Sequence, residues 1–166
     1  LKDKFNFTKG IAKNAYDIFG EQWREDFEEA VSTFFLDDEA LTSAIKGYSG
    51  FALDFMRRQK RFEKERKYQH SSYSKAAEEV YNNKEYMMEQ YLPGLLLSHY
   101  FWNHHYRQLQ FFERFFLAQL NDLPKQRFCE IGIGTGLYSR RALQLMPKST
   151  GVGFDISESS ISFSSE

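Results

Sequence analysis

Apolar side chains recur at spacings of three and four along residues 1–122, which is the period of a helix. No strand-like alternation interrupts this pattern. The clearest helix is predicted to begin at Asp37 or Asp38, because either carboxylate can accept hydrogen bonds from the free amides of a first helical turn. Its apolar face consists of Leu41, Ile45, Tyr48, Ala52, Phe55 and Phe62.

Further helices are predicted after residue 72. Two short ones cover 73–80 and 84–91, with a break at Asn82 between them. Pro93 and the glycine after it are expected to interrupt the helical structure, and a long helix then runs to about Asp122. Its apolar stripe consists of Leu97, Phe101, His105, Leu109, Phe112, Phe116 and Leu120.

The pattern changes at Gln126. A short apolar run leads into a glycine-rich loop, residues 137–146 again show helical spacing, and residues 152–154 form a second apolar run that ends at Asp155. This order predicts a β-α-β unit with parallel strands.

Composition narrows the class of protein. The 166 residues carry 22 Lys and Arg against 23 Asp and Glu, a near-balance that makes a nucleic-acid partner unlikely. Aromatic residues make up 17% of the chain, too many for a disordered protein. The single Cys129 cannot form an internal disulfide, and no apolar run reaches the ~18 residues needed to cross a bilayer. We therefore expect a cytoplasmic protein that does not span a membrane.

The glycine-rich loop carries the clearest chemistry. Glycines at 132, 134 and 136 let the backbone turn sharply and approach a ligand, and Asp155 can accept hydrogen bonds from both hydroxyls of a ribose. Leu137 stands where the nicotinamide fingerprint needs its third glycine, and no Gly-Lys-Ser/Thr step follows, which excludes a P-loop. The loop and the acid together therefore predict a site for a nucleoside.

The run from Glu130 to Gly136, together with Asp155, resembles motif I and the second-strand acid of class I S-adenosylmethionine-dependent methyltransferases. The resemblance covers only 126–166. It implies an α/β, Rossmann-like core of which only the first β-α-β part is present, preceded by an all-helical N-terminal domain. A glycine-rich turn in an unrelated α/β protein is the alternative interpretation.

The resemblance also implies roles for six residues toward S-adenosylmethionine. Three glycines would line the methionine and ribose part of the cofactor, one acid would lie near the methionine ammonium, a second acid would hold the ribose hydroxyls, and an apolar side chain would pack on the adenine. The three glycines are Gly132, Gly134 and Gly136. The acid near the ammonium is Glu130, the acid on the ribose is Asp155, and the apolar side chain on the adenine is Ile156.

Two domains follow from this interpretation. Residues 1–122 would form a helical cap that binds the substrate, and residues 123–166 would begin the cofactor-binding domain. We expect the chain to be truncated, because the remaining strands and helices require on the order of 100 further residues. The isolated piece is expected to bind cofactor poorly and to catalyse nothing.

Candidates for catalysis lie in the ring-rich stretch 91–107. His105, His104 and Tyr106 could accept a proton from a nucleophile, although core packing is the better explanation for most rings of this stretch and explains His105 equally well. Metal binding is the alternative for the histidines, but His99 lies five and six residues before the other two, which is not the usual spacing of helical ligand pairs. No metal site is predicted.

The predicted activity is methyl transfer to a small molecule by in-line displacement. Three alternatives stay open: transfer or cyclisation of the aminocarboxypropyl arm with release of methylthioadenosine, methylation of protein or RNA, and a non-catalytic helical interaction protein. The basic run 57–67, with seven basic and two acidic residues, fits an acidic partner or RNA, but its interspersed acids favour a solvated helix end. A homodimer is also left open.

Overall fold

The computed structural model describes residues 6–68, 72–120 and 126–165. Three long helices come first: α1 (Asn6–Phe19), α2 (Glu21–Phe34) and α3 (Asp38–Glu65). The predicted start of the longest one is confirmed, since the Asp37 carboxylate accepts hydrogen bonds from the amides of Glu39 and Ala40 at 3.0 and 2.8 Å. The predicted boundary at 122/123 lies outside the described residues.

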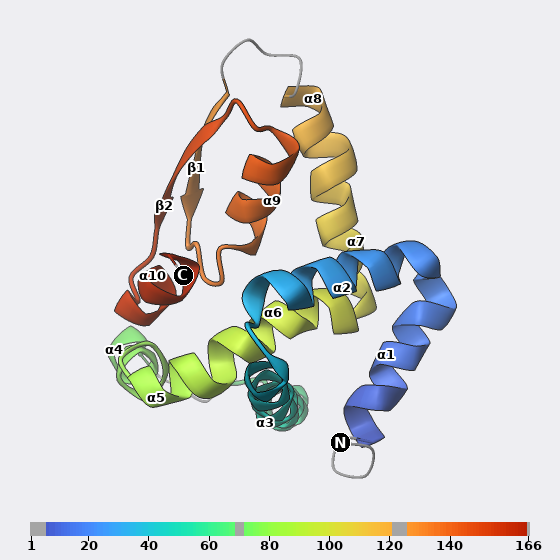
Figure 1. Ribbon diagram of the computed structural model, residues 1–166. Coiled ribbons are helices and arrows are strands. Elements are labelled where there is room, and N and C mark those ends of the chain that lie inside the picture. The colour runs from blue at the N-terminus through green and yellow to red at the C-terminus, as the bar shows by residue number, and fades with distance from the viewer. Residues whose placement is uncertain (1–5, 69–71, 121–125, 166) are drawn as a thin grey trace.

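Shorter helices with π-helical turns follow. They are α4 (Tyr73–Ala76), η1 (Ala77–Tyr81), α5 (Lys84–Tyr86), η2 (Met87–Tyr91), α6 (Leu92–Phe101), α7 (Asn103–Phe111), η3 (Phe112–Leu117) and α8 (Ala118–Leu120). The chain ends with β1 (Arg127–Ile131), α9 (Leu137–Leu145), β2 (Thr150–Phe154) and α10 (Glu158–Ser165). Helices dominate the picture, and the small sheet lies beside α9 (Figure 1).

The α/β fold class expected from the sequence is wrong. The described residues form a mostly helical protein, and their sheet has two parallel strands, β1 and β2. The local β-α-β order was predicted correctly, with Cys129 opposite Val152 in register. Two short strands offer too little surface to organise a core, so the helices supply most of it.

The main core joins the first helices to α6 and α7. Trp23 lies at its centre, stacks on Phe27 with ring centroids 5.1 Å apart, and donates a hydrogen bond from its indole N–H to the Tyr100 carbonyl at 2.8 Å. Leu137, in the first turn of α9, is buried in the same core. The β-α-β unit is therefore packed onto the helices through α9.

Polar contacts reinforce this packing. The Arg141 guanidinium of α9 pairs with Glu113 of η3 at 2.6 Å and with Glu29 of α2 at 3.1 Å. The neighbouring Arg140 guanidinium lies 4.7 Å from the centre of the Phe34 ring. Two segments that are far apart in the sequence, α2 and η3, thus hold α9 in place.

Two details of the helix prediction are wrong. The predicted long helix is broken at Trp102, whose φ and ψ of −100° and 118° are extended, while its indole N–H donates to the Tyr48 hydroxyl at 2.9 Å. Pro93 does not interrupt the helical structure. It occupies the first turn of α6, which follows η2 directly. At the break, the Trp102 ring packs against the rings of Phe51 and Phe55 of α3, with centroids 5.8 and 4.9 Å away, and these long-range contacts could not be read from local propensity.

Gly47 marks a close crossing between α3 and η2. Pro93 has no N–H to offer the Glu89 carbonyl four residues earlier, and this carbonyl points at Gly47, where an added Cβ would lie 2.2 Å from its oxygen. The helices can approach this closely only because a hydrogen atom occupies that position.

Gly47→Ala is expected to lower the free energy of unfolding by about 1–3 kcal/mol, because the new methyl group must displace backbone. The matched control is Gly10→Ala in α1, where an added Cβ would meet no atom within 4 Å. The control should stabilise the protein by about 0.5–1 kcal/mol through helix propensity alone. Chemical denaturation of both variants measures the difference, and equal effects would contradict the close crossing.

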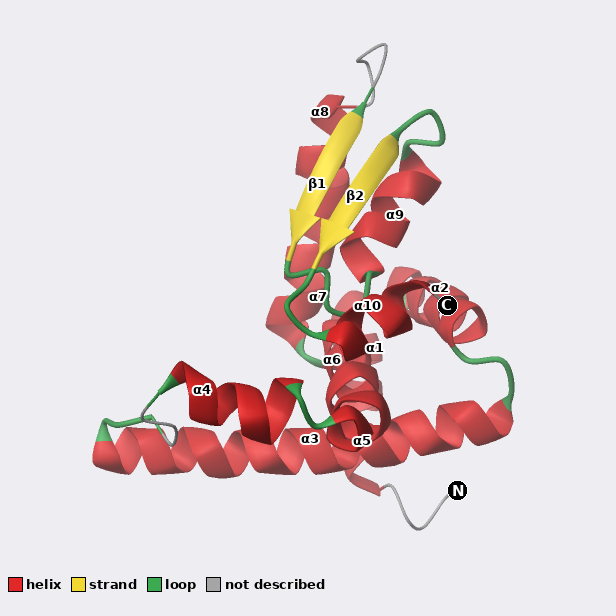
Figure 2. Cartoon of the chain, turned by 90° about the vertical axis from the view of Figure 1, so that its left-hand side faces the viewer, coloured by secondary structure: helices red, strands yellow, loops and turns green. Residues whose placement is uncertain are grey.

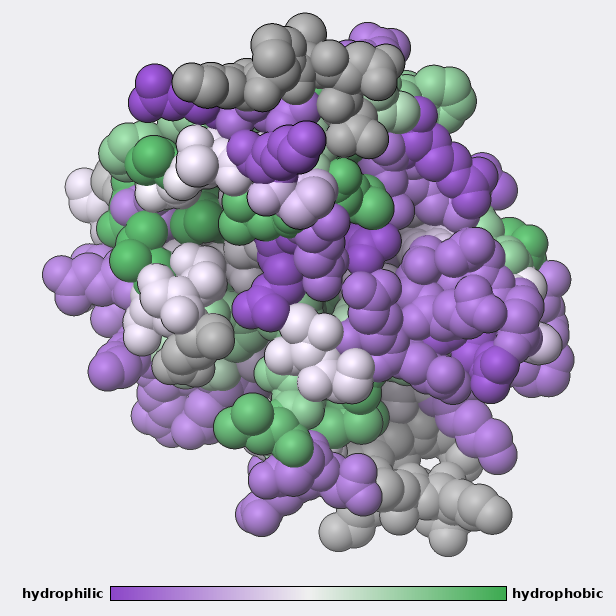
Figure 3. All heavy atoms as spheres, turned by 45° about the horizontal axis from the view of Figure 1, so that its top comes forward, coloured by the Kyte–Doolittle hydropathy of each residue, from purple (hydrophilic) through white to green (hydrophobic). Residues whose placement is uncertain are grey.

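The surface is largely polar. On the face drawn in Figure 3, hydrophilic residues cover most of the area and hydrophobic groups lie between them. In the part of the chain that the structure describes, no helix combines the length and the apolar character that a bilayer crossing requires.

Candidate functional site

The glycine-rich loop joins the carboxyl end of β1 to the start of α9. Gly132, Gly134 and Gly136 all have positive φ, at 77°, 52° and 74°, a region that side chains with a Cβ rarely adopt. The amides of Gly132 and Ile133 both donate to the Phe154 carbonyl, at 2.7 and 2.9 Å. The spacing of the glycines therefore reflects a real backbone requirement, and the loop is tied to the end of β2.

Asp155 lies directly at this loop, as its position after the second strand predicted. One carboxylate oxygen accepts a hydrogen bond from the Gly134 amide at 3.0 Å, and the other accepts one from the Ser157 amide at 2.9 Å. The carboxylate therefore braces the loop and also shapes the turn into α10. Each oxygen keeps a further lone pair for a ligand.

The carboxyl ends of both strands point toward the helical part of the protein (Figure 2). An added Cβ at Gly134 would lie 3.8 Å from a methyl group of Leu95 in α6, and the Ser157 hydroxyl donates to the Tyr81 carbonyl of η1 at 3.3 Å. Burial raises the pKa of the Tyr91 hydroxyl, and the Asp155 charge adds to this shift. Helical residues from η1, η2 and α6, far earlier in the sequence, thus lie beside the loop and Asp155.

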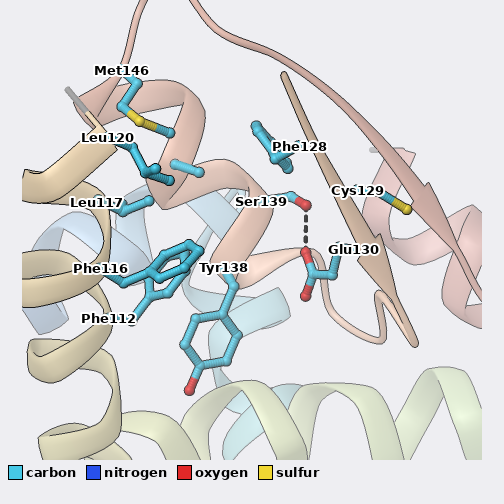
Figure 4. A pocket seen from close by; sticks show the side chains of 11 residues that line it. Phe112, Phe116, Leu117, Leu120, Phe128, Cys129, Glu130, Tyr138, Ser139 and Met146 are labelled. Atoms are coloured by element: carbon cyan, nitrogen blue, oxygen red, sulfur yellow. Dashed lines mark hydrogen bonds between the residues drawn. The ribbon is translucent and has the colours of Figure 1, made fainter. Parts of the chain in front are cut away.

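Glu130 lies two residues before the loop but faces elsewhere. Its carboxylate accepts a hydrogen bond from the Ser139 hydroxyl of α9 and lines a cavity of about 270 Å³ between β1, α9 and η3 (Figure 4). Burial raises the pKa of this carboxyl. Sequence reasoning missed Ser139, because only the packing of α9 onto β1 brings the two side chains together.

Of the three predicted catalytic residues, the structure brings the rings of His104 and His105 into contact, with centroids 4.4 Å apart, and directs Tyr106 elsewhere. His104 is exposed and lines an apolar groove beside Trp102, whereas Tyr106 is fully buried and donates its hydroxyl to the Asp26 carboxylate at 2.6 Å. Burial is the main cause that raises the pKa of the Tyr106 hydroxyl far above its usual value, and the hydrogen bond to Asp26 and its charge raise it further. Consecutive helical residues are rotated by about 100° from one another, so the structure does not bring all three into one site.

His105 is the member of this group that lies toward α9. Its Nδ1 is 3.0 Å from the Ser98 hydroxyl, which donates its own hydrogen to the Leu95 carbonyl at 2.7 Å. Nδ1 therefore carries the proton, and Nε2 keeps a lone pair. Burial and the adjacent His104 lower the pKa of His105.

His99 lies between His105 and the first turn of α9. Its ring centroid is 5.3 Å from those of His105 and Tyr138, and only 9% of the residue is exposed. Among the described residues, its buried Nδ1 has no hydrogen-bond partner. Burial lowers the pKa of His99 to about 4. In the sequence, His99 follows Leu95 by four residues and Tyr91 by eight, which places all three on one face of a helix. This spacing is the signal that could have identified His99 as a residue near the loop.

The loop residues fit a nucleoside ligand on three observations. An added Cβ at Gly132 would meet no atom within 4 Å, so space is open beside the backbone. Asp155 has lone pairs to offer, and Ile156 next to it is 68% exposed and available to a flat ring. Glu130 does not fit the expected contact with a methionine ammonium, because its carboxylate is turned to Ser139.

Comparisons of the chain with protein-family models, with curated proteins and with solved structures find no match. Residues 6–68, 72–120 and 126–165 contain no group of three or more His, Cys, Asp and Glu placed to hold a metal ion. The assignment of the loop therefore depends on its geometry and its motif.

Proposed function

We propose that this protein binds S-adenosylmethionine at the loop 132–136 and transfers its methyl group to a small molecule. The observation that carries the proposal is the direct hydrogen bond between the Gly134 amide and Asp155, which places a carboxylate with free lone pairs beside a glycine turn. Carboxylates suit a ligand that is cationic and has no phosphate, whereas a phosphate would be repelled.

The proposed contacts use residues that the loop geometry already gathers. The backbone at Gly132 and Gly134 leaves room for the ligand, Asp155 accepts the ribose hydroxyls, and Ile156 packs on the adenine. Glu130 is left out of this set because its carboxylate faces α9. S-adenosylmethionine would supply an electrophilic methyl group on a sulfonium: the acceptor's lone pair would form a bond to the methyl carbon, the carbon–sulfur bond would break, and its electron pair would stay on sulfur, which leaves as the neutral thioether.

His105 is the residue we assign to proton acceptance from the acceptor. Its lowered pKa keeps the imidazole neutral near pH 7, and its Nε2 lone pair is available because Nδ1 donates to Ser98. The geometry assigns no such role to Tyr106, whose hydroxyl is buried against Asp26.

Product analysis tests the proposal. The complete protein, incubated with methyl-labelled S-adenosylmethionine and a mixture of small metabolites, is expected to form S-adenosylhomocysteine and a labelled metabolite. Methylthioadenosine as the product would instead show aminocarboxypropyl chemistry. Absence of any S-adenosylmethionine binding would contradict the proposal and favour a helical interaction protein. Methyl label found in RNA, together with a salt-dependent affinity for RNA, would instead show that the substrate is a nucleic acid.

A further inference from the structure

The cavity beside Glu130 is built from both segments that flank the glycine loop and from the helix that covers them. β1 contributes Phe128 and Glu130, and α9 contributes Tyr138, Ser139 and Ala142. Aromatic and aliphatic side chains of η3 and α8 close the far side, as Figure 4 shows. The walls belong to rigid elements, since α9 is held by Arg141 and by the buried Leu137.

The lining is apolar with one acidic exception. Phe112, Phe116 and Leu117 face Phe128 and Ala142 across the space, and Tyr138 packs edge-on against Phe112 with ring centroids 5.0 Å apart. Glu130 is the single ionisable carboxyl among the described residues that line this cavity. An ionised carboxylate in such surroundings is costly unless it is paired.

The protein itself supplies only a neutral partner for this carboxylate. The Ser139 hydroxyl donates one hydrogen bond to Glu130, and the described lining contains no Lys, Arg or His. Burial raises the pKa of Glu130, and hydrogen bonds from the Ser139 side chain and backbone, both neutral donors, oppose this shift without reversing it. A ligand with a cationic nitrogen would provide both the countercharge and further hydrogen-bond donors.

We propose that this cavity binds an apolar amine, with its rings between Phe112, Phe128 and Ala142 and its ammonium on the Glu130 carboxylate. The volume of about 270 Å³ sets the size of the ligand. An engineered apolar cavity of ~150 Å³ holds benzene, so the space here suits a fused two-ring system with a short arm. This site is separate from the proposed cofactor site, because Glu130 faces α9 whereas Asp155 faces the loop.

The test uses two probes of the same shape, 1-naphthylmethylamine and 1-naphthylmethanol, titrated calorimetrically into the complete protein. The amine is expected to bind about tenfold more tightly than the alcohol, because one charge-assisted hydrogen bond is made to a partly buried carboxylate. Its affinity should rise with pH as Glu130 loses its proton, up to the pKa of the amine itself.

Two variants separate the charge from the cavity. Glu130→Gln should reduce the affinity for the amine about tenfold and leave the alcohol unchanged. Ala142→Phe should fill the space and abolish binding of both probes, provided that thermal unfolding shows it to be folded. Glu85→Gln, at an exposed acid of α5, is the matched control and should change neither affinity.

Three outcomes would overturn the inference. Equal affinities for amine and alcohol would remove the role of Glu130, and no binding of either probe would show that the cavity does not accept ligands. Displacement of the amine by S-adenosylhomocysteine would assign Glu130 to the cofactor instead. Continued amine binding in a protein that does not bind S-adenosylhomocysteine would support this site and contradict the proposed function, so the two failures are distinguishable.

Discussion

Replacing Asp155 by alanine is expected to weaken binding of S-adenosylhomocysteine ten- to hundredfold. The change removes the carboxylate proposed to accept the ribose hydroxyls, and hydrogen bonds to a charged group contribute about 1.5–3 kcal/mol. It also removes the acceptor for the Gly134 and Ser157 amides, which loosens the loop. Isothermal titration of the complete protein with S-adenosylhomocysteine measures the effect.

Glu158→Ala is the matched control for Asp155→Ala, because it removes an exposed acid only three residues further along, in the first turn of α10. It should leave the affinity within about twofold of the parent protein, as an exposed charge outside the site contributes little. An Asp155→Ala protein that binds as tightly as the control would show that this carboxylate only braces the loop. The assignment to S-adenosylmethionine would then be wrong.

Acidification is expected to cost the protein about 3 kcal/mol of folding free energy through His99 alone. The pKa of this histidine is about 4 in the folded protein and about 6.5 when unfolded, and each unit corresponds to about 1.4 kcal/mol. Between these values the unfolded chain binds more protons than the folded one. The stabilisation is therefore complete above pH 6.5 and is lost as the pH falls toward 4.

Chemical denaturation at pH 7 and pH 4.5 checks this expectation. His99→Phe keeps a ring against Tyr138 and His105 but cannot take up a proton, so this variant should lose much less stability on acidification. His105 acts in the same direction, because burial and His104 lower its pKa, and the double variant with His105→Phe should flatten the profile further. An unchanged profile in His99→Phe would contradict the buried neutral state of His99.

Local signals predicted the features that depend on neighbours in the sequence. Asp37 starts α3 because its side chain reaches amides two and three residues ahead. The glycine loop and Asp155 were predicted together because strand order brings the carboxyl ends of parallel strands to one edge. The fold class was wrong because it was inferred from the β-α-β motif, whereas the core belongs to the helices.

Long-range packing decided the remainder of the candidate site. The direction of Glu130 depends on Ser139 and on the cover that η3 provides, a segment that lies 10 to 15 residues before β1 and packs against α9. Beyond the break at Trp102, Tyr106 donates its hydroxyl to Asp26, which lies 80 residues earlier. No spacing rule connects these positions, because each contact forms only when distant helices pack.

The sequence by itself determined the helical character of residues 6–68 and 72–120, the start of α3, the turn at the three glycines and the meeting of that turn with Asp155, since each depends on backbone preference or on neighbours along one chain direction. Only the tertiary structure decided which side chains face one another. It buried His99, whose Nδ1 has no hydrogen-bond partner among the described residues, and placed the half-buried Glu130 in a wall of a cavity lined by aromatic rings. Burial and cavity shape arise from the packing of several elements at once, and no single stretch of residues encodes them.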